Sequence, residues 1–309
     1  MQNLSQKNIW LNIDKPIGYS SAKVVAIIKR VTGAKKVGHA GTLDPFASGV
    51  LPIALNKATK TCQYISDARK KYFFRITWGE FRDTDDVEGK VTESSLFRPK
   101  TENIISVLPN FLGKIKQTPS RFSAIKIDGK RAYELARKEI DFKIKERQVE
   151  IFSLKLISNS AEFAEFESEC SKGTYIRSLS RDICKRLSAC GYVSVLTRLM
   201  VGNFMYEKRI SLDLLKLVTT YNARFLDGSM LCLHDVLDFM PEVKLDDLDA
   251  SKFKNGQIIT INPLPLDCKS LSHKFLEPFA ANIVLVVNNV ELIGLASFEK
   301  NLLKPVNVF

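Results

Sequence analysis

The stretch GHAGTLDPFASG, residues 38–49, places a single carboxylate between glycine-rich turns. Pro45 directly follows Asp44 and disfavours helical geometry there, so Asp44 is expected in an extended or turn conformation. Gly38, Gly41 and Gly49 permit tight turns and close approach of another backbone or a ligand. Such an arrangement presents one carboxylate at the edge of a rigid element, which suits a nucleophile or a general base. The alternative interpretation is that Asp44 only caps the following turn.

Arg177 is the candidate partner of this carboxylate. It follows a break at Gly173 and lies at the expected start of a helix, from which its guanidinium can reach a neighbouring acid. An arginine beside an aspartate favours the ionised carboxylate and orients it through charge-assisted hydrogen bonds. Because the two residues are far apart in the sequence, an ordinary surface arginine is the alternative.

The chain is strongly basic. Its 309 residues include 46 Lys and Arg against 34 Asp and Glu, which gives a formal net charge of +12 and a pI of about 9.3. A positive surplus of this size favours a polyanionic partner, nucleic acid before an anionic membrane surface. Basic side chains also interleave with the rings of Tyr72, Tyr133 and Tyr175, a combination suited to phosphates and unpaired RNA bases. A chain that is basic without a functional reason is the alternative.

Several kinds of site are not indicated. The sequence has neither GxGxxG nor GxxxxGK[ST], so dinucleotide and P-loop chemistry are not expected. The segment DTDDVEG (residues 83–89) superficially resembles a calcium loop, but Val87 holds its fifth position and cannot ligate. The cysteines form no CxxC pair, so we expect free thiols, no metal site and no cofactor. They are Cys62, Cys170, Cys184, Cys190, Cys232 and Cys268.

No segment is expected to reach or cross a membrane. The N-terminus has no basic segment leading into an apolar run, as a signal peptide would. The longest apolar stretch, residues 282–296, is interrupted by asparagines and a glutamate, so it cannot span a bilayer. With free thiols, these features indicate a cytoplasmic protein.

The apolar patterning predicts strands at residues 7–13, 70–79, 148–157, 161–169 and 192–204. One helix is expected to begin at Ser20 or Ser21 and to end at Gly33, and another to follow Gly173 and end at Gly191. Strands separated by helices and hairpins indicate an α+β fold with a mixed or antiparallel central sheet and flanking helices, not a βαβ nucleotide fold.

Two domains are expected. Near residue 240 the sequence changes to short apolar runs with Asn-Gly and Asn-Asn turns, which suits a small β-barrel. We therefore divide the chain into a large domain of residues 1–240 and a small one of residues 241–309. Within the large domain, residues 125–138 should form a strand, a turn at Asp128-Gly129 and a short helix.

Taken together, the motifs resemble the TruB family of bacterial tRNA pseudouridine synthases over nearly the whole chain. The match is carried by LNIDKPIGYSS, VGHAGTLDPFASGVLPIALNKATK, KKYFFRITWGEFRDTDDVEG, QTPSRFSAIKIDGKRAYELAR and CSKGTYIRSLSRDI. More weakly, NGQIITI, IGLASF and LKPVNVF resemble a PUA-type RNA-binding barrel. The resemblance implies the pseudouridine synthase fold with a PUA-like C-terminal domain and an RNA-gripping insertion at about residues 115–145.

The implied reaction converts uridine 55 in the T-arm loop of tRNA to pseudouridine through base flipping. By position, Asp44 would be the nucleophile at ribose C1′ or uracil C6, and Arg177 would pair with it. Tyr72 would stack on the uracil and could move a proton, and His39 would replace the extruded base in the stack. The further residues implied in binding or supporting the RNA are Gly41, Leu43, Tyr175, Leu196, Lys15, Lys60 and Asp86.

The resemblance further implies that tRNA is the partner, that no protein partner or cofactor is needed, and that the protein is a monomer. Phe122 stands where the family usually has tyrosine, which removes one hydroxyl but keeps the ring. Two alternatives stay open: a non-catalytic RNA-binding protein or tRNA chaperone, and a related synthase that acts on another RNA.

Overall fold

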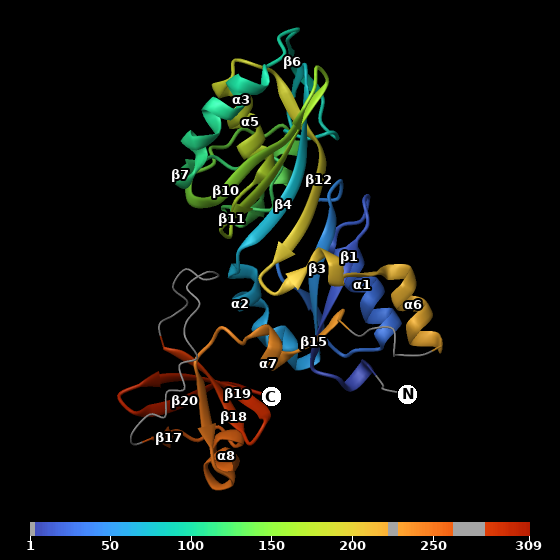
Figure 1. The fold of residues 1–309 in the computed structure, drawn as a ribbon. Coiled ribbons are helices and arrows are strands. Elements are labelled where there is room, and N and C mark those ends of the chain that lie inside the picture. Colours follow the sequence, from blue (N-terminus) through green and yellow to red (C-terminus); the bar gives the residue numbers. More distant parts are fainter. Residues whose placement is uncertain (1–3, 222–227, 262–281) are drawn as a thin grey trace.

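The computed structural model describes residues 4–221, 228–261 and 282–309, and within them one large mixed sheet dominates (Figure 1). Its order is β14-β1-β3-β12-β4-β11-β10-β7, with β13, β15 and β2 attached to β12, β1 and β3. Pairs β1–β14 and β3–β12 are parallel and the others antiparallel. The strands are β1 (Ile9–Lys15), β2 (Val37–His39), β3 (Ser48–Leu55), β4 (Lys70–Trp78), β7 (Gly113–Gln117), β10 (Arg147–Asn159), β11 (Phe163–Cys170), β12 (Gly191–Val201), β13 (Phe204–Met205), β14 (Ile210–Ser211) and β15 (Met230–Cys232).

Besides this sheet, the described residues form helices and two small hairpins. The hairpins pair β5 (Glu80–Arg82) with β6 (Val91–Ser94) and β8 (Lys126–Ile127) with β9 (Lys130–Arg131). The helices are α1 (Ser21–Thr32), α2 (Cys62–Asp67), α3 (Thr101–Val107), α4 (Ala132–Arg137), α5 (Ile176–Arg186), α6 (Leu212–Tyr221), α7 (Leu233–Val236) and α8 (Asp247–Lys254), and the 3-10 turns are η1 (Leu4–Gln6), η2 (Asn56–Thr61), η3 (Leu108–Phe111) and η4 (Tyr206–Lys208). The α+β prediction is confirmed.

Helix α1 forms where the sequence predicts it, because both ends carry capping residues. The Ser20 hydroxyl accepts a hydrogen bond from the Lys23 N–H at 3.1 Å, and Gly33 ends the helix in the left-handed conformation. Val24 and Ile28, one turn apart, are fully buried in the core that α1 shares with β1 and β3.

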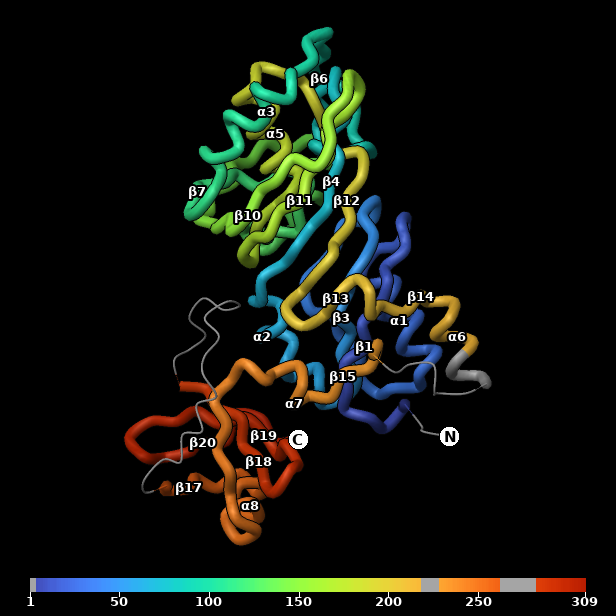
Figure 2. The backbone as a smooth tube through the Cα atoms, in the orientation of Figure 1, coloured from blue at the N-terminus to red at the C-terminus, as the bar shows by residue number. Residues whose placement is uncertain are grey.

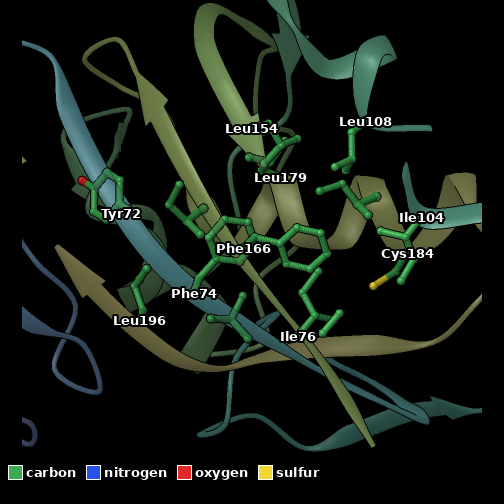
Figure 3. Close-up of a cluster of buried hydrophobic side chains, with 14 of the residues drawn as sticks. Tyr72, Phe74, Ile76, Ile104, Leu108, Leu154, Phe166, Leu179, Cys184 and Leu196 are labelled. Carbon is green, nitrogen blue, oxygen red and sulfur yellow. The ribbon is translucent and has the colours of Figure 1, made fainter. Parts of the chain in front are cut away.

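Strands β4 and β12 are the long central strands that run side by side through the upper part of the molecule in Figure 1. The residues of β4 alternate, and every second side chain from Lys70 to Trp78 is buried. Phe74 stacks on Phe166 of β11 with ring centroids 5.2 Å apart. Figure 3 shows Tyr72 and Leu196 at one end of this cluster, which brings them to the edge of a well-packed core.

The C-terminal residues form a second sheet of order β16-β18-β19-β20-β17, with α8 beside it. The strands are β16 (Glu242–Leu245), β17 (Ile259–Thr260), β18 (Ile283–Asn288), β19 (Glu291–Glu299) and β20 (Leu302–Val308). The curled sheet is consistent with the predicted PUA-like barrel, whereas α8, capped by Asp246, is not in the prediction. The boundary at residue 240 stays a prediction, and Cys268 lies outside the described residues.

This second sheet packs on the first part of the chain. Leu285 and Leu295 share one apolar cluster with Trp10, Tyr64 and Phe204 of the large sheet and its helices. Figure 2 shows the chain passing from β15 through α7 into the C-terminal sheet, which lies at the opposite end of the molecule from α3 and β6. The large sheet and the C-terminal sheet are therefore joined by a shared apolar cluster and not only by a linker.

Gly49 allows the parallel contact between β3 and β12. It lies opposite Arg198 with φ of +101°, and a Cβ there would lie 2.4 Å from the Arg198 carbonyl oxygen. Only glycine fits this combination of backbone conformation and close approach.

We predict that Gly49→Ala lowers the free energy of unfolding by about 2–4 kcal/mol, because backbone strain adds to the steric clash. Gly113→Ala is the matched control, since Gly113 has φ of +77° but nothing within 4 Å of the added Cβ. It should lose only about 1 kcal/mol. Equilibrium urea denaturation of both variants checks this, and equal losses would contradict the close-approach argument.

Candidate active site

A cavity of about 470 Å³ opens at the end of the core where Tyr72 and Leu196 lie. Its walls come from the loop between β2 and β3, the first half of β4, the β8–β9 hairpin, the residues before α5, and β12. The predicted site residues that line it are Gly41, Leu43, Asp44, Tyr72, Tyr175, Arg177 and Leu196. Segments far apart in the sequence thus meet around one cavity.

The loop that carries Asp44 is held from two sides. On one side, the Ser21 hydroxyl donates to the Leu43 carbonyl at 3.1 Å and accepts from the Leu43 N–H at 3.0 Å. On the other, the buried Arg198 guanidinium donates to the carbonyl oxygens of Gly41 and Val50, at 3.0 and 2.7 Å. These contacts fix the backbone on both sides of Asp44.

The Asp44 carboxylate faces Arg177. Its Oδ2 lies 2.9 Å from Arg177 Nε, and the side chain is 31% exposed, so it is accessible from the cavity. The turn that follows is closed by the Asp44 backbone carbonyl, which accepts from the Ala47 N–H at 3.1 Å. The capping alternative therefore does not describe where the side chain points.

Arg177 is buried and joins two carboxylates. Its Nη1 lies 3.0 Å from Asp86 Oδ2 and donates to the Thr84 carbonyl, while Nη2 donates to the Phe122 carbonyl at 3.2 Å. Burial alone would lower the pKa of Arg177, but Asp44, Asp86 and Asp85 together raise it above its ordinary value. The guanidinium is thus permanently charged. Because Phe122 contributes its backbone, the missing tyrosine hydroxyl does not affect this contact.

The DTDDVEG segment supplies the second carboxylate of this network. Asp86 Oδ1 accepts from the Thr84 hydroxyl at 2.6 Å and the Glu88 N–H at 3.0 Å, and Asp85 pairs with Arg181 of α5 at 2.9 Å. Gly89 is required, because a Cβ there would lie 2.3 Å from Thr84 Oγ1. The loop therefore anchors helix α5 through two arginines one turn apart.

Two tyrosines contribute neutral rings to the cavity. Burial raises the pKa of Tyr72 above its ordinary value, although Arg198 beside it acts in the opposite direction. Burial likewise raises the pKa of Tyr175, whose backbone is held by Gln117 through bonds of 2.8 and 3.1 Å. Both phenols therefore keep their protons at neutral pH.

Four predicted residues do not line the cavity. Asp86 lies behind Arg177, and the fully buried Lys15 donates to the carbonyls of Pro16, Tyr19 and Pro45, so it supports the Asp44 loop from below. Burial lowers the pKa of Lys15 to about 8.

The other two lie at the periphery. Lys60 is exposed and donates to the Val308 carbonyl at 3.2 Å, so it contacts the C-terminal sheet. His39 ends β2 and is half-buried, and burial and Arg198 lower its pKa below the ordinary value. Within the described residues its Nδ1 is buried without a hydrogen-bond partner.

The structure adds cavity residues that the sequence analysis did not single out for this site. Lys70 and Arg198 are buried at its base, and three cations are exposed at its mouth: Lys126, Arg131 and Arg147. A charged residue inside an otherwise apolar strand was the available signal for Arg198.

Two kinds of feature were also searched across the described ranges. No helix there is long and apolar enough to span a membrane. In the same part of the chain, no group of three or more His, Cys, Asp or Glu side chains could hold a metal ion.

We predict that Asp86→Asn lowers the free energy of unfolding by about 3 kcal/mol, because it removes one partner of a buried ion pair. The matched control is Asp67→Asn, whose carboxylate pairs with Lys172 at 2.8 Å but is 37% exposed. That variant should lose at most about 1 kcal/mol. Urea denaturation of both checks the difference, and similar small losses would mean that the buried network contributes little to folding.

Comparisons with known proteins identify the family of the chain. The family model described as "TruB family pseudouridylate synthase (N terminal domain)" matches residues 29–176. The tRNA pseudouridine synthase B of Ehrlichia ruminantium (strain Gardel) is 42% identical over 308 residues, covering 97% of this chain and 98% of that protein. The protein of the same name from Bradyrhizobium diazoefficiens is 45% identical over 256 residues, covering 82% and 74%.

Solved structures show the same fold. A Cbf5-Nop10-Gar1 complex contains a chain with a TM-score of 0.74 at 24% identity, covering 99% of this chain and 85% of that one. An H/ACA RNP bound to a substrate RNA containing 2'-deoxyuridine gives a TM-score of 0.72 at 22% identity, covering 97% and 84%. The sequence matches show, and the shared fold supports, that this chain belongs to the TruB family of pseudouridine synthases.

Proposed function

We propose that this protein isomerises a uridine of tRNA to pseudouridine, at position 55 in the T-arm loop, with Asp44 as the nucleophile. The observation that carries the proposal is the Asp44–Arg177 pair at 2.9 Å, in which an accessible carboxylate is held by a buried cation inside the cavity. The charged guanidinium orients the carboxylate for nucleophilic attack. The family of the chain supports the same reaction.

The isomerisation exchanges a bond to nitrogen for a bond to carbon. The C1′–N1 bond breaks, the uracil rotates, C5 bonds to C1′, the C5 proton is lost, and N1 gains a proton. Asp44 attacks either C1′ or C6 and leaves again when the C5–C1′ bond has formed. Tyr72 stacks on the base, and its neutral hydroxyl can pass a proton during the exchange.

Access to the uridine requires that it leave the loop, which costs a few kcal/mol of stacking. Tyr72 and Tyr175 offer rings for the extruded base. His39 ends β2, just before the Asp44 loop, and we propose that it fills the vacated position in the stack. The exposed Lys126, Arg131 and Arg147 supply charge for the phosphates at the mouth. We propose that the protein acts as a monomer in the cytoplasm without a protein partner.

Release of tritium from a tRNA transcript labelled at uracil C5 tests this function directly, because the C5 hydrogen is lost in the reaction. We expect release from the unmodified transcript and none from a transcript that carries cytidine at position 55. Binding without release would favour the non-catalytic RNA-binding alternative. Release that persists on the cytidine transcript would mean that another uridine is the substrate.

We predict that Asp44→Asn abolishes tritium release while its affinity for tRNA stays within about tenfold of wild type, because phosphate contacts dominate affinity. Asn keeps the size of the side chain but cannot act as a carboxylate nucleophile. Single-turnover release and filter binding measure the two quantities. Turnover close to that of wild type would remove Asp44 from the mechanism.

A further inference from the structure

Two buried cations lie side by side at the base of the cavity. Arg198 of β12 pairs with Tyr72 of β4, and Lys70 lies two residues before Tyr72 on the same strand. Because side chains alternate along a strand, Lys70, Tyr72 and Arg198 point to one face of the sheet. Lys70 is 6% exposed and Arg198 is 1% exposed, yet both line the cavity.

These cations are held by neutral groups. Lys70 Nζ donates to the carbonyls of Ser66 and Ala68 at 2.5 and 2.6 Å, and Arg198 donates to those of Gly41, Thr42 and Val50. In the part of the chain that the structure describes, neither side chain forms an ion pair with a carboxylate. Arg177, in contrast, has two.

An uncompensated buried charge is costly, and two adjacent ones also repel each other. Burial, reinforced by Arg198, lowers the pKa of Lys70 to about 8. Carbonyl dipoles offset part of this cost, but the bottom of the cavity keeps a net positive charge. Negative charge on a ligand that enters the cavity is stabilised by these cations.

Building on the proposed function, we propose that Lys70 and Arg198 stabilise the negative charge that develops on the uracil ring during catalysis. If Asp44 attacks C1′, the electron pair of the broken C1′–N1 bond passes to the ring and is shared by O2 and O4. If Asp44 attacks C6, the displaced electron pair places negative charge on C5 and O4. Both routes place negative charge on the pyrimidine ring. Lys70 and Arg198 at the bottom of the cavity can therefore stabilise it in either route.

The position of Lys70 and Arg198 favours the uracil base, and not a phosphate, as the group that they contact. The phosphates of the RNA backbone are strongly hydrated. They can be bound at the mouth of the cavity, where Lys126, Arg131 and Arg147 are exposed. The flipped base is the part of the nucleotide that enters the cavity and reaches Tyr72, beside which both buried cations lie.

Lys70→Met tests the proposal, because Arg198 also holds the Asp44 loop and its loss would disturb both functions. Lys71→Met is the matched control, since Lys71 is the next residue on β4, points to the opposite face and pairs with Glu167 at 2.5 Å. Tritium release is measured in a single turnover at saturating tRNA, and affinity by filter binding.

We expect Lys70→Met to lower the saturating rate by about 10²–10³-fold, the range for loss of one group that stabilises transition-state charge. Its affinity should stay within about threefold of the Lys71→Met control. Weaker binding at an unchanged saturating rate would overturn the proposal and assign the pair to a phosphate. A rate equal to that of the control would also overturn it. Since wild type is assayed in parallel, inactive wild-type protein would count against the proposed function itself.

The pH dependence gives a second readout that simple loss of packing would not produce. The groups that face Lys70 are Arg198 of β12, Cys170 of β11, Asp67 of α2 and Lys172, and Asp67 and Lys172 pair with each other at 2.8 Å. Burial raises the pKa of Cys170 to about 12, so that thiol stays neutral. The wild-type rate should therefore fall as pH rises through about 8, where Lys70 loses its proton.

Lys70→Arg should retain most activity and move this fall to higher pH, because guanidinium keeps its proton throughout the range. A fall that stays near pH 8 in Lys70→Arg would overturn the assignment and point to Lys15, whose pKa is also lowered to about 8. Thermal melts of all variants establish that the proteins compared are folded.

Discussion

The buried guanidinium of Arg177 is the interaction on which the site depends. It contacts Asp44 and Asp86, at 2.9 and 3.0 Å, and donates to carbonyls in the segments after β5 and after β7. Removing Arg177 would leave the buried carboxylate of Asp86 without its counter-charge. The Asp44 loop, the DTDDVEG loop, the segment after β7 and α5 must therefore all be in place before the carboxylate can be held.

The site separates two kinds of positive charge. Arg177 is paired with carboxylates, one of which is Asp44, whereas Lys70 and Arg198 are held by carbonyls and line the cavity. In the proposed function, the exposed cations at the mouth bind the phosphates. The chain has a net charge of +12, and its basic residues carry the same charge. Their burial and their partners, and not their charge alone, distinguish what they can contact.

Much of this arrangement could be predicted from sequence because its signals are local. Ser20 and Gly33 delimit α1, and the alternation of β4 places Tyr72 on the core face. The pairing of Asp44 with Arg177 is visible only as compatible chemistry, and the family resemblance supplied the rest. Strand β3 is missing from the predictions, since Pro52 lies within it and proline normally argues against an inner strand. The proximity of Lys70 to Arg198 was not predicted, because only the register of β4 against β12 shows them to be neighbours.

The most direct test of the account is whether Arg177 and Asp86 act on Asp44 as one unit. Single-turnover rates at saturating tRNA would be measured for Arg177→Lys, Asp86→Asn and the double variant. If the buried network has a single task, the double variant should be no slower than the slower single variant, because either change already frees Asp44. Fully additive losses would contradict the account, since they would show that the two residues support the reaction independently.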